Sequence, residues 1–327
     1  MRNTTKLFGI IAIVAVIGLS FASCGDNGGG GGSVGELLAD GVIVDLNLEG
    51  TNLVAAAVAH ANSNPGDGPF LLRLRSNLMV DDVATIEAGV HLTVEGIGGR
   101  RRITRTGQGN LFNVNLGNRS LTLGDNITLA GTASNNVALV HIAGGSSLTM
   151  NVGAQITSNT GGGVNVTGGT STFTMNGGEI FGNTTAGVGS GGGLRAAAGA
   201  FVVMHPGAVI WGNTTTGNNS GRVYMSGATS TFRMLGGEIR GNGSPGTNTA
   251  GGVFIDNGAF QIVNGVIYGG TGTNANTGTT NDALLMVGGT ATLGTMVGGV
   301  FTPANPAVTL ASDDTTIRVA NGVRLTN

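Results

Sequence analysis

Charged residues and cysteine are scarce in this chain. Only 10% of its 327 residues are charged, and the formal net charge is −2. A chain of this kind has no broad basic field that would hold nucleic acid, so nucleic-acid binding is excluded as a leading function. Cys24 is the single cysteine, which excludes an intrachain disulfide framework and a cysteine-based zinc site.

Aromatic residues are also few, at 4%, whereas hydrophobic residues reach 40% and glycine accounts for 63 positions. The apolar content is sufficient to bury a long core. The glycines do not follow the one-in-three register of collagen. The composition therefore indicates a folded chain with many short elements joined by tight turns.

The N-terminus has the features of an export signal. Arg2 and Lys6 precede the apolar run 7–21, and Cys24 follows at once. The run is short for a membrane-spanning helix and fits the apolar region of a secretory signal. We therefore expect three parts: a signal peptide at 1–23, a Gly-rich tether at 24–40 and one domain at 41–327.

The segment Phe21-Ala22-Ser23-Cys24 resembles a bacterial lipoprotein signal. The resemblance implies lipidation of Cys24, and therefore an exported, lipid-anchored envelope protein whose first partner is a membrane. It favours the outer membrane or the cell surface over the inner membrane. An ordinary signal peptide with an incidental thiol is the alternative.

One helix is predicted in the domain. Residues 51–62 carry Leu53, Ala57 and Ala61 at helical spacing, and Asn64-Pro65-Gly66 ends the pattern. From Phe70 onward, short alternating runs separated by glycine indicate strands. We expect the helix to cover the first coil of a strand-built domain.

An internal repeat predicts how the strands are arranged. The isoleucines that share one repeat position follow an apolar-x-apolar run and a Gly-containing turn: Ile156, Ile180, Ile210, Ile239 and Ile267. Copies recur every 25 to 31 residues or so, which is near the length of a solenoid repeat. The fold class predicted is all-β, a right-handed parallel β-helix with three strands per coil. The matched asparagines Asn159, Asn183, Asn213 and Asn242 would stack as a ladder.

The phrases Gly177-Gly178-Glu179-Ile180 and Gly236-Gly237-Glu238-Ile239 resemble the Gly-Gly-x-Ile repeats of polymorphic outer-membrane proteins. The architecture also resembles that of pectate-lyase-like β-helix proteins. These resemblances imply a β-helix of a bacterial surface protein, and they specify a fold better than a function.

Carboxylates that would support catalysis are sparse. Glu179 and Glu238 share a register two coils apart, which predicts a separation of roughly 10 Å, marginal for a glycosidase pair. Asp81-Asp82 would meet one of Arg100, Arg101 or Arg102, or else form a solvated turn. The four histidines show no metal-ligand spacing. We predict no catalytic residues, no metal and no cofactor.

Aromatic residues concentrate in one predicted outward column. The positions that follow the stacked isoleucines are Thr157, Phe181, Trp211, Arg240 and Tyr268. A column rich in aromatic residues would bind sugar rings or a protein, with Phe181, Trp211, Arg240 and Tyr268 as the contact residues. The alternative is that a loop covers the rings. A second column, Asn165, Arg195, Tyr224 and Phe254, has the same character.

The sequence therefore predicts a non-enzymatic, lipid-anchored β-helix whose outer face binds a polysaccharide or a surface protein. Two alternatives remain open. One is a polysaccharide lyase or glycoside hydrolase, which would require a groove with at least two carboxylates. The other is a purely structural envelope protein, which would have no exposed aromatic column.

Overall fold

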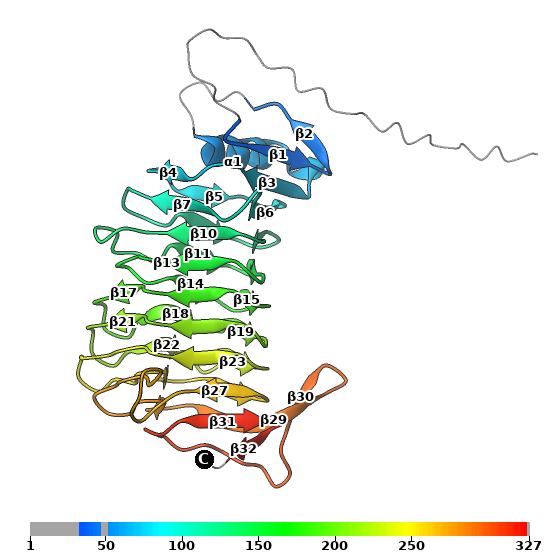
Figure 1. Ribbon diagram of the computed structural model, residues 1–327. Coiled ribbons are helices and arrows are strands. Elements are labelled where there is room, and N and C mark those ends of the chain that lie inside the picture. The colour runs from blue at the N-terminus through cyan, green and yellow to red at the C-terminus, as the bar shows by residue number, and fades with distance from the viewer. Residues whose placement is uncertain (1–32, 47–51, 326–327) are drawn as a thin grey trace, which may run out of the picture. The chain divides into compact units, whose positions relative to one another are not determined.

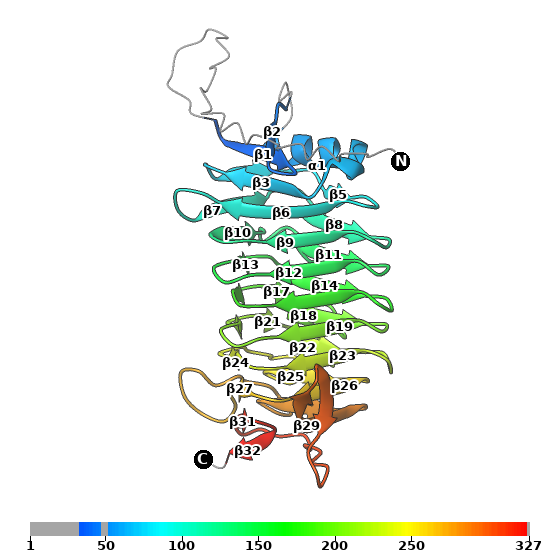
Figure 2. The same cartoon turned by 90° about the vertical axis from the view of Figure 1, so that its right-hand side faces the viewer.

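The computed structural model describes residues 33–46 and 52–325, which form one compact unit from Ser33 onward. Of these residues, 46% lie in strands and 5% in helices. Short strands form a solenoid of about eight turns around an apolar core. Figures 1 and 2 show the stack of strands in two views at right angles. The right-handed parallel β-helix predicted from the repeat is confirmed.

Three long sheets, here called A, B and C, build the described stack. In spatial order, sheet A contains β2 (Val42–Val44), β1 (Gly35–Ala39), β3 (Phe70–Leu74), β6 (His91–Gly96), β9 (Ser120–Leu123), β12 (Ser147–Met150), β15 (Thr172–Met175), β19 (Phe201–Met204), β23 (Thr231–Met234), β26 (Ala259–Ile262), β29 (Thr290–Val297) and β30 (Val300–Pro303). Sheet B contains β4 (Leu78–Val80), β7 (Arg101–Arg105), β10 (Ile127–Ala130), β13 (Gln155–Thr157), β16 (Glu179–Phe181), β20 (Val209–Trp211), β24 (Glu238–Arg240), β27 (Gly265–Ile267), β31 (Ile317–Ala320) and β32 (Val323–Leu325). Sheet C contains β5 (Ala84–Ile86), β8 (Phe112–Asn115), β11 (Val140–Ala143), β14 (Val164–Thr167), β18 (Gly191–Ala197), β22 (Gly221–Met225), β25 (Val253–Ile255) and β28 (Leu284–Met286). A small fourth sheet pairs β17 (Thr184–Thr185) with β21 (Thr214–Thr215).

The five isoleucines that share a repeat position form one buried stack in sheet B. Their strands pair in consecutive parallel register, and each isoleucine is at most 1% exposed. Alternation along each strand sends every second side chain inward. The inward chains of all three sheets therefore join in one continuous core.

The Gly-Gly-x-Ile phrase forms the turn from sheet A to sheet B. Gly178 and Gly237 have φ of +77° and +88°, which is the left-handed region that glycine tolerates. A Cβ at either position would also lie 2.5 Å from a carbonyl oxygen, that of Ala154 or Ala208. Glycine is therefore required at this turn by both the backbone angle and the close approach of the coil before it.

Buried asparagines form a ladder at the turn from sheet B to sheet C. Asn183 Nδ2 donates to Asn213 Oδ1 at 3.1 Å, and Asn213 Nδ2 donates to Asn242 Oδ1 at 3.2 Å. The backbone N–H of Asn159 donates to Asn183 Oδ1 at 3.2 Å. The predicted ladder is confirmed and is longer than predicted, with the members Asn135, Asn159, Asn183, Asn213, Asn242 and Asn276.

Helix α1 (Leu53–Ser63) lies where a helix was predicted at 51–62 and is followed by a 3-10 turn, η1 (Pro65–Asp67). Asn52 caps its first turn by accepting from the Ala55 N–H at 2.9 Å. Leu53, Ala57 and Ala61 are buried in the core together with the first coils. The helix therefore covers the apolar interior at this end, as expected.

Both ends of the described stack contain antiparallel strands, which the repeat did not predict. At one end β1 pairs antiparallel with β3; at the other, β30 pairs with β29 and β31 with β27. Residues 35–39, the last part of the segment expected as a tether, form β1. Its Leu37 is fully buried.

Candidate functional site

The outward column of sheet B lies in the predicted register. Phe181 pairs with Thr157 on one side and Trp211 on the other, and Trp211 pairs with Arg240. The Tyr268 backbone N–H donates to Ile239 O at 3.0 Å, which continues the column by one coil. Phe181, Trp211, Arg240 and Tyr268 are all half-buried.

Trp211 is held between its two neighbours. The Phe181 and Trp211 rings are parallel within 5°, with their centroids 4.8 Å apart. Arg240 places its guanidinium carbon 5.4 Å from the Trp211 ring centroid, and it comes from the coil on the opposite side from Phe181. Both π-faces of Trp211 are therefore occupied within the column. This arrangement leaves Phe181, at the end of the stack, as the ring with a face directed away from its partner.

Arg240 also forms an ion pair with Glu238, with Nε and Oε2 3.1 Å apart. Tyr268 has a different neighbour, because Arg318 of β31 lies over its ring at 5.6 Å. Residues of the added antiparallel strand therefore complete this end of the column. The sequence could not reveal this contact, because Arg318 lies outside the repeat.

A pocket of about 300 Å³ opens beside Phe181. Its walls include Phe181, Thr157 and Gln155 together with three consecutive arginines, and Trp211 does not line it. The pocket therefore lies on the side of Phe181 that faces away from Trp211. We call it the arginine pocket, and its lining is Asn77, Arg100, Arg101, Arg102, Thr128, Gln155, Thr157, Ser158 and Phe181.

None of the three arginines of this pocket pairs with a carboxylate among the described residues. Arg100 donates to Gly153 O at 2.6 Å, and Arg102 Nε donates to Thr104 Oγ1 at 3.3 Å. Asp81 and Asp82 act instead on buried Arg105, whose pKa is lowered by burial and partly restored by these two carboxylates. Asp81 and Asp82 are exposed and form no ion pair with Arg100, Arg101 or Arg102, which agrees with the solvated turn given as the alternative.

The two glutamates of sheet B each contact another side chain of the same outward face. Val209 lies between Glu179 and Glu238 in the strand pairing, as the register predicted. Glu179 accepts a hydrogen bond from Gln155 at 3.0 Å, and Glu238 binds Arg240. Among the described residues, no group of three or more His, Cys, Asp or Glu side chains converges as a metal site would require.

The second column, on sheet C, is divided into two parts. Tyr224 and Phe254 are only 6% and 1% exposed and pack with Ala250 and Leu285 in a small separate core. Their rings stack with centroids 5.6 Å apart, and the Tyr224 hydroxyl donates to Asp256 at 3.1 Å. Ala250 lies outside the strands, and the loop residue Gly189 is close to the Tyr224 hydroxyl, so loops contribute to the burial of these rings, as in the alternative given for the aromatic columns.

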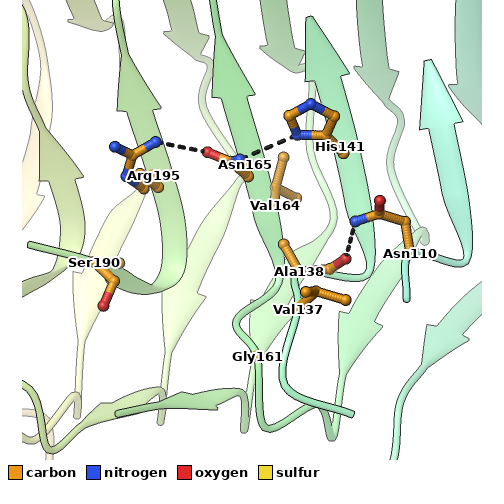
Figure 3. Close-up of a pocket in the computed structure, with 10 residues that line it drawn as sticks. Asn110, Val137, Ala138, His141, Gly161, Val164, Asn165, Ser190 and Arg195 are labelled. Carbon is orange, nitrogen blue, oxygen red and sulfur yellow. Dashed lines mark hydrogen bonds between the residues drawn. The ribbon is translucent and has the colours of Figure 1, made fainter. Parts of the chain in front are cut away.

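The other part of this column lines a second pocket, also of about 300 Å³. Figure 3 shows His141, Asn165 and Arg195 in a row across β11, β14 and β18. Arg195 Nη1 donates to Asn165 Oδ1 at 3.2 Å, and Asn165 Nδ2 contacts His141 Nδ1 at 3.1 Å. We call this the sheet-C pocket. Its lining is Asn110, Val137, Ala138, His141, Gly161, Val164, Asn165, Ser190, Gly191 and Arg195.

The protonation of His141 follows from this row. Burial lowers its pKa, and the nearby Arg195 charge lowers it further. Because Asn165 uses its carbonyl oxygen for Arg195, its amide group donates to His141 Nδ1, which must then be an acceptor. The neutral ring therefore has its proton on Nε2. The sequence identified Asn165 and Arg195 as column members but did not predict a pocket.

Cys24, the predicted lipidation site, and the predicted signal peptide at 1–23 lie outside the described residues. Over the residues that are described, no helix combines the length and the apolar character that crossing a membrane requires. A scan against models of protein families found no match for this chain, and searches of curated proteins and of solved structures found none either.

Proposed function

We propose that this chain is a non-enzymatic, lipid-anchored module of the bacterial cell envelope that binds an acidic glycan along the outer face of sheet B. One observation carries the proposal. Phe181 ends a stacked aromatic column and at the same time forms a wall of a pocket lined by Arg100, Arg101 and Arg102. An aromatic wall suits the apolar face of a sugar ring, and guanidinium groups suit its carboxylate or sulfate.

The remaining pocket groups support this assignment. Thr128 donates to Gln155, which in turn donates to Glu179, so this outward face carries a continuous row of hydrogen-bonding side chains. Sugars present many hydroxyls, and such rows offer both donors and acceptors. An enzyme of the lyase or hydrolase type has less support, because the carboxylates of this face are engaged with Gln155 and Arg240.

Attachment to a membrane is the second part of the proposal. It is supported by the positive start of the chain, the apolar run 7–21 and the position of Cys24 immediately after it. A lipid on Cys24 would hold the β-helix at the surface of a membrane, since each buried methylene contributes about 0.8 kcal/mol. The outer face of sheet B would then bind glycan close to that membrane surface.

The test is a glycan array probed with a soluble form beginning at Ser33, followed by titration of the best acidic glycan. Trp211 reports on the site, because it stacks on Phe181 and its indole nitrogen is buried. We expect a saturable change in its emission. The Phe181→Ala variant should lose at least tenfold in affinity. Arg102→Gln should weaken binding of the acidic glycan more than binding of a neutral one.

Phe201→Ala provides a matched control. Phe201 is also a half-buried outward aromatic with an arginine near its ring, Arg233 at 5.2 Å, but it belongs to sheet A. Its loss should leave glycan binding unchanged. The proposal is refuted if no glycan binds, or if Phe181→Ala and Phe201→Ala affect binding equally.

A further inference from the structure

The sheet-C pocket contains one cationic group and no anionic one. Arg195 is its only arginine or lysine, and no aspartate or glutamate lines it. Among the described residues, Arg195 also forms no ion pair elsewhere. A half-buried guanidinium in such a setting attracts an anion, because no ion pair offsets its charge directly and it is not fully hydrated.

The guanidinium of Arg195 is already oriented. Nη1 donates to Asn165 Oδ1 at 3.2 Å and Nε donates to Gly189 O at 3.4 Å, while Nη2 makes no hydrogen bond to the described residues. Asn165 is itself held by His141 (Figure 3). A ligand oxygen that accepts from Nη2 would therefore meet a donor whose position is fixed, which reduces the entropic cost of binding.

The net charge of the pocket favours a ligand with one negative charge over a dianion. His141 contributes no positive charge near pH 7, since its pKa is lowered by burial and by Arg195. A single guanidinium balances one negative charge and matches the planar geometry of a carboxylate. A phosphate dianion would leave about one charge uncompensated in a partly desolvated site.

The other lining residues indicate the chemistry of the rest of the ligand. Val137 and Ala138 give it an apolar wall, and its volume is at the lower end for small-molecule sites. The Asn110 amide group donates to Ala138 O at 2.6 Å, and the Ser190 hydroxyl donates to Gly187 O. Asn110 Oδ1 and Ser190 Oγ therefore remain as acceptors for a hydroxyl or ammonium group.

We propose that the sheet-C pocket binds a small organic monocarboxylate, with Arg195 pairing with the carboxylate. This site is on a different sheet from the glycan face and does not depend on it. The carboxylate can belong to a free acid or to a single uronic sugar. Both sources offer the same group to Arg195.

The test is NMR of the His141 ring protons, assigned by their loss in His141→Gln, during titration with lactate and with glucuronate. Lactamide and glucose serve as the matched neutral compounds, and inorganic phosphate as the dianion. We expect saturable shifts with at least one carboxylate and none with its neutral partner. The bound carboxylate should also raise the pKa of His141, because it offsets the Arg195 charge. Response to lactate alone identifies a free acid, and response to glucuronate alone identifies the sugar-borne group.

Variants separate the pocket from other arginine sites. Arg195→Gln should weaken binding at least tenfold, whereas Arg233→Gln, an outward arginine of sheet A, should not change it. Val137→Phe should block the pocket without touching Arg195, which keeps the test valid if Arg195→Gln does not fold. The proposal is overturned if no carboxylate shifts the His141 ring-proton resonances, or if phosphate alone shifts them. It is also overturned if a folded Val137→Phe or Arg195→Gln variant binds the carboxylate as tightly as the parent.

Discussion

Replacing Asn213 by alanine should remove a central rung of the asparagine ladder. Asn213 Nδ2 donates to Ile180 O at 2.9 Å and to Asn242 Oδ1 at 3.2 Å. Its Oδ1 accepts from both the backbone N–H and the side-chain amide of Asn183, each at 3.1 Å. The side chain is 0% exposed, so water does not replace these partners in the folded state.

The size of the effect follows from the groups that lose a partner. The Asn183 backbone N–H makes no other hydrogen bond to the part of the chain that the structure describes, and a buried donor left unpaired costs about 1 to 3 kcal/mol. Asn183 Nδ2 keeps its bonds to Ile156 O and Phe181 O, and Asn242 Oδ1 keeps the Asn213 backbone N–H. The variant also loses the bonds from Asn213 to Ile180 O and Asn242 Oδ1 and the bond from Asn183 Nδ2, each with a smaller net contribution. Together these losses should lower the free energy of unfolding of Asn213→Ala by about 2 to 6 kcal/mol.

Urea denaturation followed by circular dichroism would measure this loss. Asn176→Ala is the control, because Asn176 is exposed and its bond to Asn151 is solvated, so the expected change is within about 0.5 kcal/mol. Asn135→Ala, at the end of the ladder, removes fewer bonds and should fall between the two. Equal effects of Asn213→Ala and Asn176→Ala would show that the ladder does not stabilise the stack.

Three further predictions concern the core, the anchor and the pH response. Ile210→Asp should abolish cooperative thermal unfolding, because it places an unpaired charge in a fully buried stack. Val209→Asp, at an outward position of the same strand, is the control and should be tolerated. Cys24→Ala should move the protein from the detergent or membrane phase to the aqueous phase on fractionation, whereas unchanged retention would indicate an uncleaved apolar anchor. Because the pKa of folded His141 is lowered, the unfolded chain takes up a proton first as the pH falls below about 6.5, and the folded state loses stability. His141→Gln should flatten this part of the Tm-versus-pH curve, and an unchanged acid slope in this variant would contradict the assignment.

The register of the β-helix was predictable because each strand alternates and each coil repeats. Ile180, Ile210 and Ile239 occupy matched places in the sequence, so their pairing in space follows directly. Alternation directs the next residue of each strand outward, and the same register places Phe181 beside Trp211. One apolar position in each copy therefore determined both a core stack and an outward column.

The orientation and cover of side chains were not predictable in this way. The sequence places Trp211 on the outer face, but not its ring between Phe181 and Arg240. Tyr224 has the same outward position and yet is buried, in a cluster that includes Ala250, a residue outside the strands. Exposure at an outward position depends on loops whose lengths differ from coil to coil, and these carry no repeat signal.

The constant register has a consequence for how this molecule can change in length. Thr172 pairs with Ser147 before it and with Phe201 after it, at the same position in each strand. Excising residues 172–200 would therefore bring Ser147 against Phe201 with every inward side chain still facing the core, and duplicating them would add one coil. Whole coils are thus units that evolution can delete or copy without redesigning the interior, so the extent of the outer faces can vary independently of the fold that supports them.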